Sequence, residues 1–112
     1  MQLTFRLLAA AFMCAGAYHL LAMANGAPEE RVRHATFALI DVLVGVLMVR
    51  RPPGFAIAFA LLCGQQLASH GAALAQSLRE GHVDVISIVV VVTMPAALAL
   101  LLIDARKKRA TR

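Results

Sequence analysis

Residues 83–103 read VDVISIVVVVTMPAALALLLI, and this stretch decides the class of the protein. Asp84 is its one ionisable side chain. A helix rises about 1.5 Å per residue, so a helix of this length crosses the ~30 Å hydrocarbon core of a bilayer. Three similar stretches precede it, at residues 3–23, 32–49 and 55–78. The sequence therefore predicts an all-α membrane protein, a four-helix transmembrane bundle that forms one domain over residues 1–112.

The composition supports this class. Hydrophobic residues make up 61% of the 112 positions and charged residues 15%, too apolar for a water-soluble domain of this size. The net charge of +5 does not indicate a nucleic-acid partner, because much of it lies in a basic tail at residues 104–112. Such a tail anchors a membrane protein against anionic headgroups, so we expect the lipid bilayer as its partner.

Basic residues divide unevenly between the two faces of the predicted bundle. Arg6, the Arg50–Arg51 pair and five residues of the tail put eight on one face, while Arg31, Arg33 and Arg79 put three on the other. Arginine and lysine accumulate on the cytoplasmic side of membrane proteins. We therefore predict a multi-pass protein of a bacterial-type inner membrane, with both termini cytoplasmic.

The first apolar stretch also resembles a secretory signal. Arg6 precedes it, and Ala15-Gly16-Ala17 resembles a cleavage site of small residues. The apolar run continues beyond this point through residues 20–23. We therefore expect the stretch to be retained as a membrane helix.

Turn residues mark the connections between the stretches. We expect residues 24–31, which contain Pro28, to form the largest loop, and residues 50–54 (RRPPG) to form a stiff turn. Gly81 is expected to end the third helix, and Asp84 to cap the fourth.

The polar residues inside the predicted helices gather in the outer half of the membrane. His19 lies about one turn from the outer end of its helix, and His70 lies about 12 Å below the outer end of the third. Asp41 lies about 10 Å below His34 and, seven residues along, on the same helix face. An ionised carboxylate in hydrocarbon costs on the order of 3 kcal/mol, so Asp41 should have a partner or a function. We predict that Asp41 meets His19 and His70 at one site.

Further polar residues flank this predicted site. On the third stretch Cys63, Gln66, His70, Ala73 and Ser77 alternate by three and four, which predicts a polar face turned toward protein. Gly45 continues the face of Asp41 and should admit a close neighbour. The secondary candidates for the site are His34, His82, Gln66, Asp84 and Ser87.

The leading interpretation is a small membrane binding or accessory protein with a ligand site. His19, Asp41 and His70 offer ligands for a transition metal such as Zn, Cu, Ni or Fe. Alternatively, His19 and His70 would ligate haem b while Asp41 orients one imidazole, or the three residues would hold a quinone headgroup. The chain contains no sharp metal signature such as HExxH or paired CxxC motifs.

Two other interpretations use the same residues. Asp41 and His70 would form the proton-coupled pair of a small transporter or channel, whose narrow protomer would need an oligomer. Otherwise their hydrogen bonds would only lock the bundle as a structural subunit of a larger membrane complex. Catalysis is not expected, because adjacent Ser69 and His70 point about 100° apart on a helix and no Gly-rich phosphate loop is present.

Overall fold

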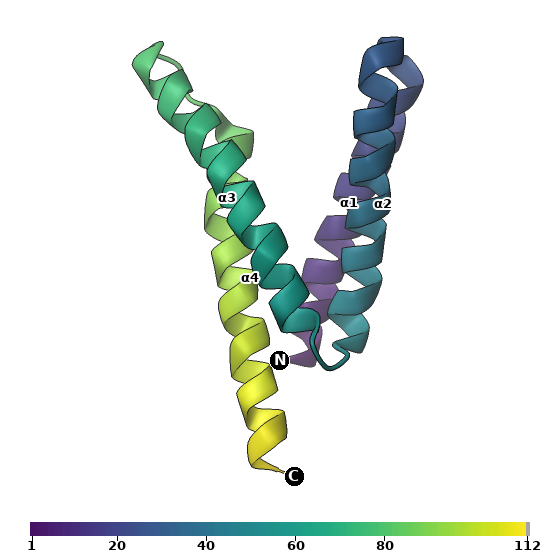
Figure 1. The fold of residues 1–112 in the computed structure, drawn as a ribbon, viewed down its shortest axis with the longest axis vertical. Coiled ribbons are helices and arrows are strands. Elements are labelled where there is room, and N and C mark those ends of the chain that lie inside the picture. The colour runs from purple at the N-terminus through teal and green to yellow at the C-terminus, as the bar shows by residue number, and fades with distance from the viewer. Residues whose placement is uncertain (112) are drawn as a thin grey trace. The chain divides into compact units, whose positions relative to one another are not determined.

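The computed structural model describes residues 1–111, which are almost entirely helical (Figure 1). Within these residues lie α1 (Gln2–Asn25), α2 (Pro28–Arg50), α3 (Phe55–Arg79) and α4 (Val85–Ala110). Each of these helices is long and apolar enough to cross a membrane. The predicted all-α fold with four potential membrane spans is confirmed at this level.

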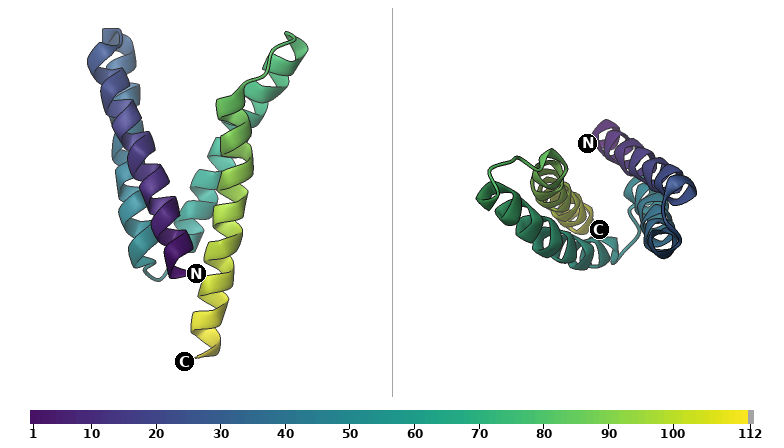
Figure 2. Two further views of the ribbon diagram at one scale, coloured as in Figure 1. Left: turned by 180° about the vertical axis from the view of Figure 1, so that it is seen from behind. Right: turned by 90° about the horizontal axis from the view of Figure 1, so that it is seen from above.

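The chain divides into two compact units, each of which is a helical hairpin. Residues Met1–Pro52 contain α1 and α2, and residues Pro53–Arg112 contain α3 and α4. In each hairpin the two antiparallel helices lie side by side (Figures 1 and 2). The association of the two hairpins into one bundle stays a prediction.

The connection in the first hairpin is shorter than the predicted loop at residues 24–31. α1 continues to Asn25 and α2 begins at Pro28, which leaves two residues between the helices. Proline at the first helical position loses no hydrogen bond, because that N–H has no partner within the helix. The carboxylates of Glu29 and Glu30 in the first turn also favour an early start through the helix dipole.

The last helix also extends further than predicted. α4 continues through most of the basic tail to Ala110, and Lys108 Nζ lies 3.0 Å from Asp104 Oδ2, one turn earlier. Basic side chains in the last turn stabilise a helix by complementing its dipole. Arg112, the last residue of the predicted tail, lies outside the described residues.

Small residues bring α1 and α2 close together. A methyl group added to Gly16 would lie 3.3 Å from the carbonyl oxygen of Ala38, and one added to Gly45 would lie 3.2 Å from that of Ala9. All four residues are buried. Such residues allow membrane helices to approach closely, and the predicted role of Gly45 is confirmed.

The second hairpin buries one stripe of each helix and exposes large apolar side chains elsewhere. The polar stripe predicted on α3 is confirmed in part, since Cys63 and Ser77 are buried while Ala73 is exposed. Exposed side chains such as Ile57 and Leu61 suit contact with lipid. The buried residues of α4 recur every three, four or seven positions: Ser87, Met94, Ala97, Leu101 and Asp104.

Both predicted caps between α3 and α4 are present. Gly81 has a φ of +78°, and its N–H donates to Leu78 O at 3.2 Å while His82 N–H donates to Ser77 O at 3.0 Å. This is the Schellman arrangement, which favours glycine because of its left-handed backbone. Asp84 caps α4 through its side chain, as predicted.

Candidate functional site

The first hairpin holds a polar cluster of His19, His34 and Asp41, called here the α1–α2 cluster. The two Nδ1 atoms of His19 and His34 lie 3.0 Å apart. On the other side of the ring, His19 Nε2 lies 3.8 Å from Asp41 Oδ2, with exposed fractions of 23% and 16% for the two side chains. Each ring nitrogen of His19 therefore faces one titratable side chain of α2: Nδ1 faces His34 and Nε2 faces Asp41.

Local sequence explains this arrangement. His34, Phe37 and Asp41 recur at intervals of three and four, so they share one face of α2. The Phe37 ring stacks on the His19 ring with centroids 5.3 Å apart and planes 26° apart. The sequence interpretation missed Phe37, although its spacing from the two polar residues was a usable signal. Gly16, one turn before His19, allows the close approach of the helices.

The contact between His19 and His34 constrains where protons lie. A hydrogen bond between two Nδ1 atoms holds one proton, so one ring donates and the other accepts. When His34 donates, a neutral His19 carries its own proton on Nε2, facing Asp41. In this arrangement the proton on His19 Nε2 faces the Asp41 carboxylate across a 3.8 Å separation, which is longer than a hydrogen bond.

The second hairpin holds a different polar cluster of His70, Asp84 and Ser87, called here the α3–α4 cluster. Ser87 Oγ donates to Asp84 Oδ2 at 2.6 Å, and Ser87 N–H donates to Asp84 Oδ1 at 3.0 Å. His70 Nδ1 lies 3.0 Å from Ser87 Oγ. Since the one hydroxyl proton of Ser87 goes to Asp84, His70 donates from Nδ1, and the neutral form of His70 then has its lone pair on Nε2.

The charge of Asp84 fixes the direction of these hydrogen bonds. The hydrogen bond from the Ser87 side chain, together with that from its backbone N–H, lowers the pKa of Asp84 below its ordinary value. An ionised carboxylate only accepts hydrogen bonds, so Ser87 must donate to it. The hydrogen bonds that join His70, Ser87 and Asp84 also differ from those of a nucleophilic triad, because the serine proton goes to the carboxylate and not to the histidine.

The remaining sequence candidates have other partners. Gln66 Nε2 donates to Gln65 Oε1 at 2.8 Å. His82 Nδ1 lies 3.8 Å from Glu80 Oε2, and both of these side chains are more than half exposed. Within residues 1–111, neither Gln66 nor His82 takes part in the hydrogen bonds described for the two clusters.

The structure places the three principal candidates in two hairpins. His19 and Asp41 lie beside each other in the first hairpin, whereas His70 belongs to the second. The convergence of all three on one site stays a prediction, as does a metal held by them. Over residues 1–111, no group of three or more His, Cys, Asp or Glu side chains is arranged to hold a metal ion.

Comparison with known proteins adds no relative. No protein-family model, curated protein or solved structure matches this chain.

Proposed function

We propose that this protein spans a bacterial-type cytoplasmic membrane with both termini in the cytoplasm, and that it is the protomer of a proton-coupled transporter or channel. The eight-to-three division of basic residues supports the orientation. The observation that carries the proposed activity is the chain His34–His19–Asp41, in which one imidazole contacts two titratable groups.

The order of the α1–α2 cluster suits proton uptake from outside. In the proposed orientation His34 is the shallower residue of α2, and Asp41 lies seven residues further along, about 10 Å deeper. Ionisable groups at such depth are expensive and commonly mark proton relays. A proton that binds His34 would displace the His34 Nδ1 proton onto His19 Nδ1 across 3.0 Å. His19 would then release its Nε2 proton to the ionised Asp41 once the 3.8 Å separation between them closes to hydrogen-bond distance.

The cytoplasmic half of α2 does not continue this relay. Between Asp41 and Arg50 the helix contains no titratable side chain, and Val44 and Met48 are buried there. The path inward must therefore come from water, from the second hairpin or from another copy. The proposal accordingly includes a homo-oligomer or a larger membrane complex.

Proton flux into proteoliposomes tests this function. Purified protein is reconstituted with a trapped pH-sensitive dye, and a pH gradient is imposed. Asp41→Asn keeps the shape of the side chain but removes the proton acceptor, so flux should disappear. Glu29→Gln is the matched control, because it neutralises an exposed carboxylate in the first turn of the same helix. Equal flux in wild type and Asp41→Asn would refute the relay.

A second candidate function rests on the α3–α4 cluster. The bonds from Asp84 through Ser87 orient the His70 ring and leave its Nε2 lone pair available. Hydrogen bonds that orient the imidazole in this way are common at histidine ligands of metals and haem. His70 would then ligate haem b or a transition metal.

Absorption spectroscopy and elemental analysis of one detergent-purified sample test the second candidate. A Soret band or a stoichiometric metal should be lost in His70→Ala and retained in His82→Ala, which removes an exposed histidine of the nearby loop. A colourless, metal-free wild-type sample would exclude the ligand site. Transport or a structural role would then remain.

A further inference from the structure

Helix α3 carries a second face suited to helix packing, separate from the side that packs against α4. The side that packs against α4 buries Phe55, Phe59, Cys63 and Ser77. The residues of the second face recur at alternating intervals of four and three, the spacing at which one side of a helix faces a partner helix. This face, called here the α3 glutamine face, consists of Ala58, Leu62, Gln65, Ser69, Ala72 and Gln76.

The α3 glutamine face is uncovered and poorly suited to lipid. Its residues are exposed, except for the half-buried Leu62. Between residues 62 and 77 α3 exposes no large apolar side chain, whereas α4 exposes Ile86, Val89 and Val92. The face extends over about 27 Å of helix, nearly the thickness of the hydrocarbon core. In the proposed membrane placement it would therefore set small and polar side chains against lipid tails.

Gln65 is the residue of this face that most needs a partner. It lies two residues after buried Cys63, which turns it about 160° away from that residue. Its Oε1 accepts from Gln66 Nε2 at 2.8 Å, while within residues 1–111 its own Nε2 donors have no acceptor. Ten residues after the start of α3, it lies about 15 Å along the helix, near the middle of the bilayer. Unpaired amide donors in hydrocarbon are costly, so we expect protein to cover this face.

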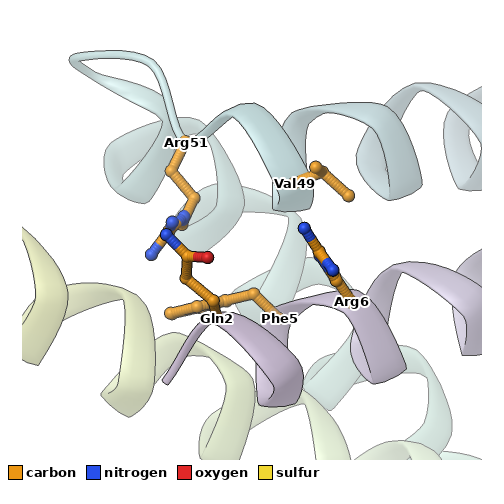
Figure 3. Close-up of a pocket in the computed structure, with 5 residues that line it drawn as sticks. All are labelled: Gln2, Phe5, Arg6, Val49 and Arg51. Atoms are coloured by element: carbon orange, nitrogen blue, oxygen red, sulfur yellow. The ribbon is translucent and has the colours of Figure 1, made fainter.

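The first hairpin offers no matching amide at this depth. Within Met1–Pro52 the amide side chains are Gln2 and Asn25, at opposite ends of α1. The Gln2 amide lies beside Arg51 (Figure 3), and Asn25 Nδ2 donates to a backbone carbonyl of its own helix. Asp41, the carboxylate within the apolar stretch of α2, lies beside His19. A second copy of α3 is therefore the better match.

We propose that the α3 glutamine face joins two copies of this chain through a parallel contact between their α3 helices. Both copies cross the membrane in the same orientation, so a two-fold axis must run along the membrane normal. A residue beside that axis meets its own copy. An amide both donates and accepts, so Gln65 can pair with itself, and Ala58 and Ala72 allow the two helices to approach closely.

The inference rests on the proposed membrane placement and not on proton uptake. A proton-flux test in which Asp41→Asn behaves as wild type would leave the dimer standing, because association is measured without a proton gradient. A monomeric wild type with intact proton flux would overturn the dimer contact alone.

Energy transfer between labelled copies of the full chain in liposomes tests the contact over a range of protein-to-lipid ratios. Gln65→Leu should raise the dissociation constant of the dimer about tenfold or more, because the hydrogen bonds of both copies are lost. Gln66→Leu is the matched control, since it makes the same change one residue along and outside the face. It should change the dissociation constant less than about threefold. Gln65→Asn keeps an amide and should retain part of the association, and circular dichroism should show all variants folded.

Disulfide cross-linking in membranes locates the contact. In a chain whose Cys14 and Cys63 are replaced by alanine, Ala72→Cys should give a cross-linked dimer on oxidation, because the two positions lie beside the axis. Val92→Cys, at an exposed position of α4, should not. A monomeric wild type, in which the first hairpin or lipid would cover the face, would overturn the proposal. Equal effects of Gln65→Leu and Gln66→Leu, or equal cross-linking at positions 72 and 92, would overturn it as well.

Discussion

Replacement of Gly16 by alanine tests the close approach that brings His19 to α2. The added methyl group would lie 3.2 Å from Val42 Cγ2 and 3.3 Å from the carbonyl oxygen of Ala38. Ordinary van der Waals contact begins at about 3.4 Å, so α1 and α2 must separate by a few tenths of an ångström. The backbone carbonyl cannot move away without moving its helix, and the β-branched valine has few alternative rotamers.

Two opposing effects set the magnitude. Alanine in place of glycine stabilises a helix by about 1 kcal/mol, whereas overpacking a closely packed contact costs about 1–3 kcal/mol. Gly16→Ala should therefore change the free energy of unfolding by between about zero and a loss of 2 kcal/mol. Gly64 has no heavy atom within 4 Å of an added methyl group. Gly64→Ala therefore measures only the stabilisation that alanine gives a helix relative to glycine. The two variants should differ by about 1–3 kcal/mol.

Equilibrium unfolding in mixed detergent micelles measures this difference. The wild type and both alanine variants are compared by circular dichroism under identical conditions. Gly16→Ala should also reduce proton flux, because separation of the helices lengthens the 3.8 Å distance between His19 and Asp41. Free energies for Gly16→Ala and Gly64→Ala that agree within about 0.5 kcal/mol would refute the packing argument.

Other predictions concern the hydrogen-bond chains, the effect of pH and the orientation. Asp84→Asn should reverse the α3–α4 chain, because the Asn amide donates to Ser87 and the hydroxyl proton then goes to His70; ¹⁵N NMR should find the His70 proton on Nε2 instead of Nδ1. The hydrogen bonds from Ser87 lower the pKa of Asp84 below its ordinary value of 3.8. Ionised Asp84 therefore stabilises the fold fully above pH 3.8, and this stabilisation is lost as pH falls through the lower pKa of the folded state. Unfolding measured from about pH 5 to about pH 2 should show a larger loss of stability in wild type than in Asp84→Asn. His34→Ala should change the ¹⁵N resonances of His19 and leave those of His70 unchanged. Reporters that work only in the cytoplasm should be active when they are fused to either end of this sequence. Activity of a reporter that works only outside the cytoplasm would overturn the orientation.

The sequence was sufficient to predict the helices and the shared face of His34 and Asp41. Apolar stretches of membrane length require helices, and a spacing of seven residues fixes one side of a helix. The partner of that face was harder to predict, because periodicity gives no rotation or depth of one helix relative to another.

The pairing of His19 with His34 depended on the length of one connection. A second helix that began only at residue 32, after the predicted loop at residues 24–31, would hold His34 in its first turn, close to the membrane surface. In the structure His19 lies six residues before the end of α1 at Asn25, and His34 lies six residues after the start of α2 at Pro28. Two helices joined by a two-residue connection bring such positions to equal depth, and the two imidazoles therefore meet.

The contact between His70 and Ser87 arises in the opposite way, from an uneven connection. His70 lies nine residues before the end of α3 at Arg79, whereas Ser87 lies two residues after the start of α4 at Val85. The nine helical residues rise about 14 Å, and the extended residues between the helices return most of that distance at about 3.3 Å each. A fourth helix that began at residue 83 would have placed Ser87 at a different depth.

Asp41 and His70 each have a partner within their own hairpin, and this weakens the reason to expect that they meet at one site. The sequence argument brought Asp41 and His70 together because a carboxylate in hydrocarbon needs a partner. The structure supplies that partner within each hairpin, since His19 lies beside Asp41 and Ser87 lies beside His70. The contacts of these groups within each hairpin therefore do not themselves require the hairpins to converge. A site that joins Asp41 to His70 would have to be selected by a function in which protons or a ligand pass between the hairpins.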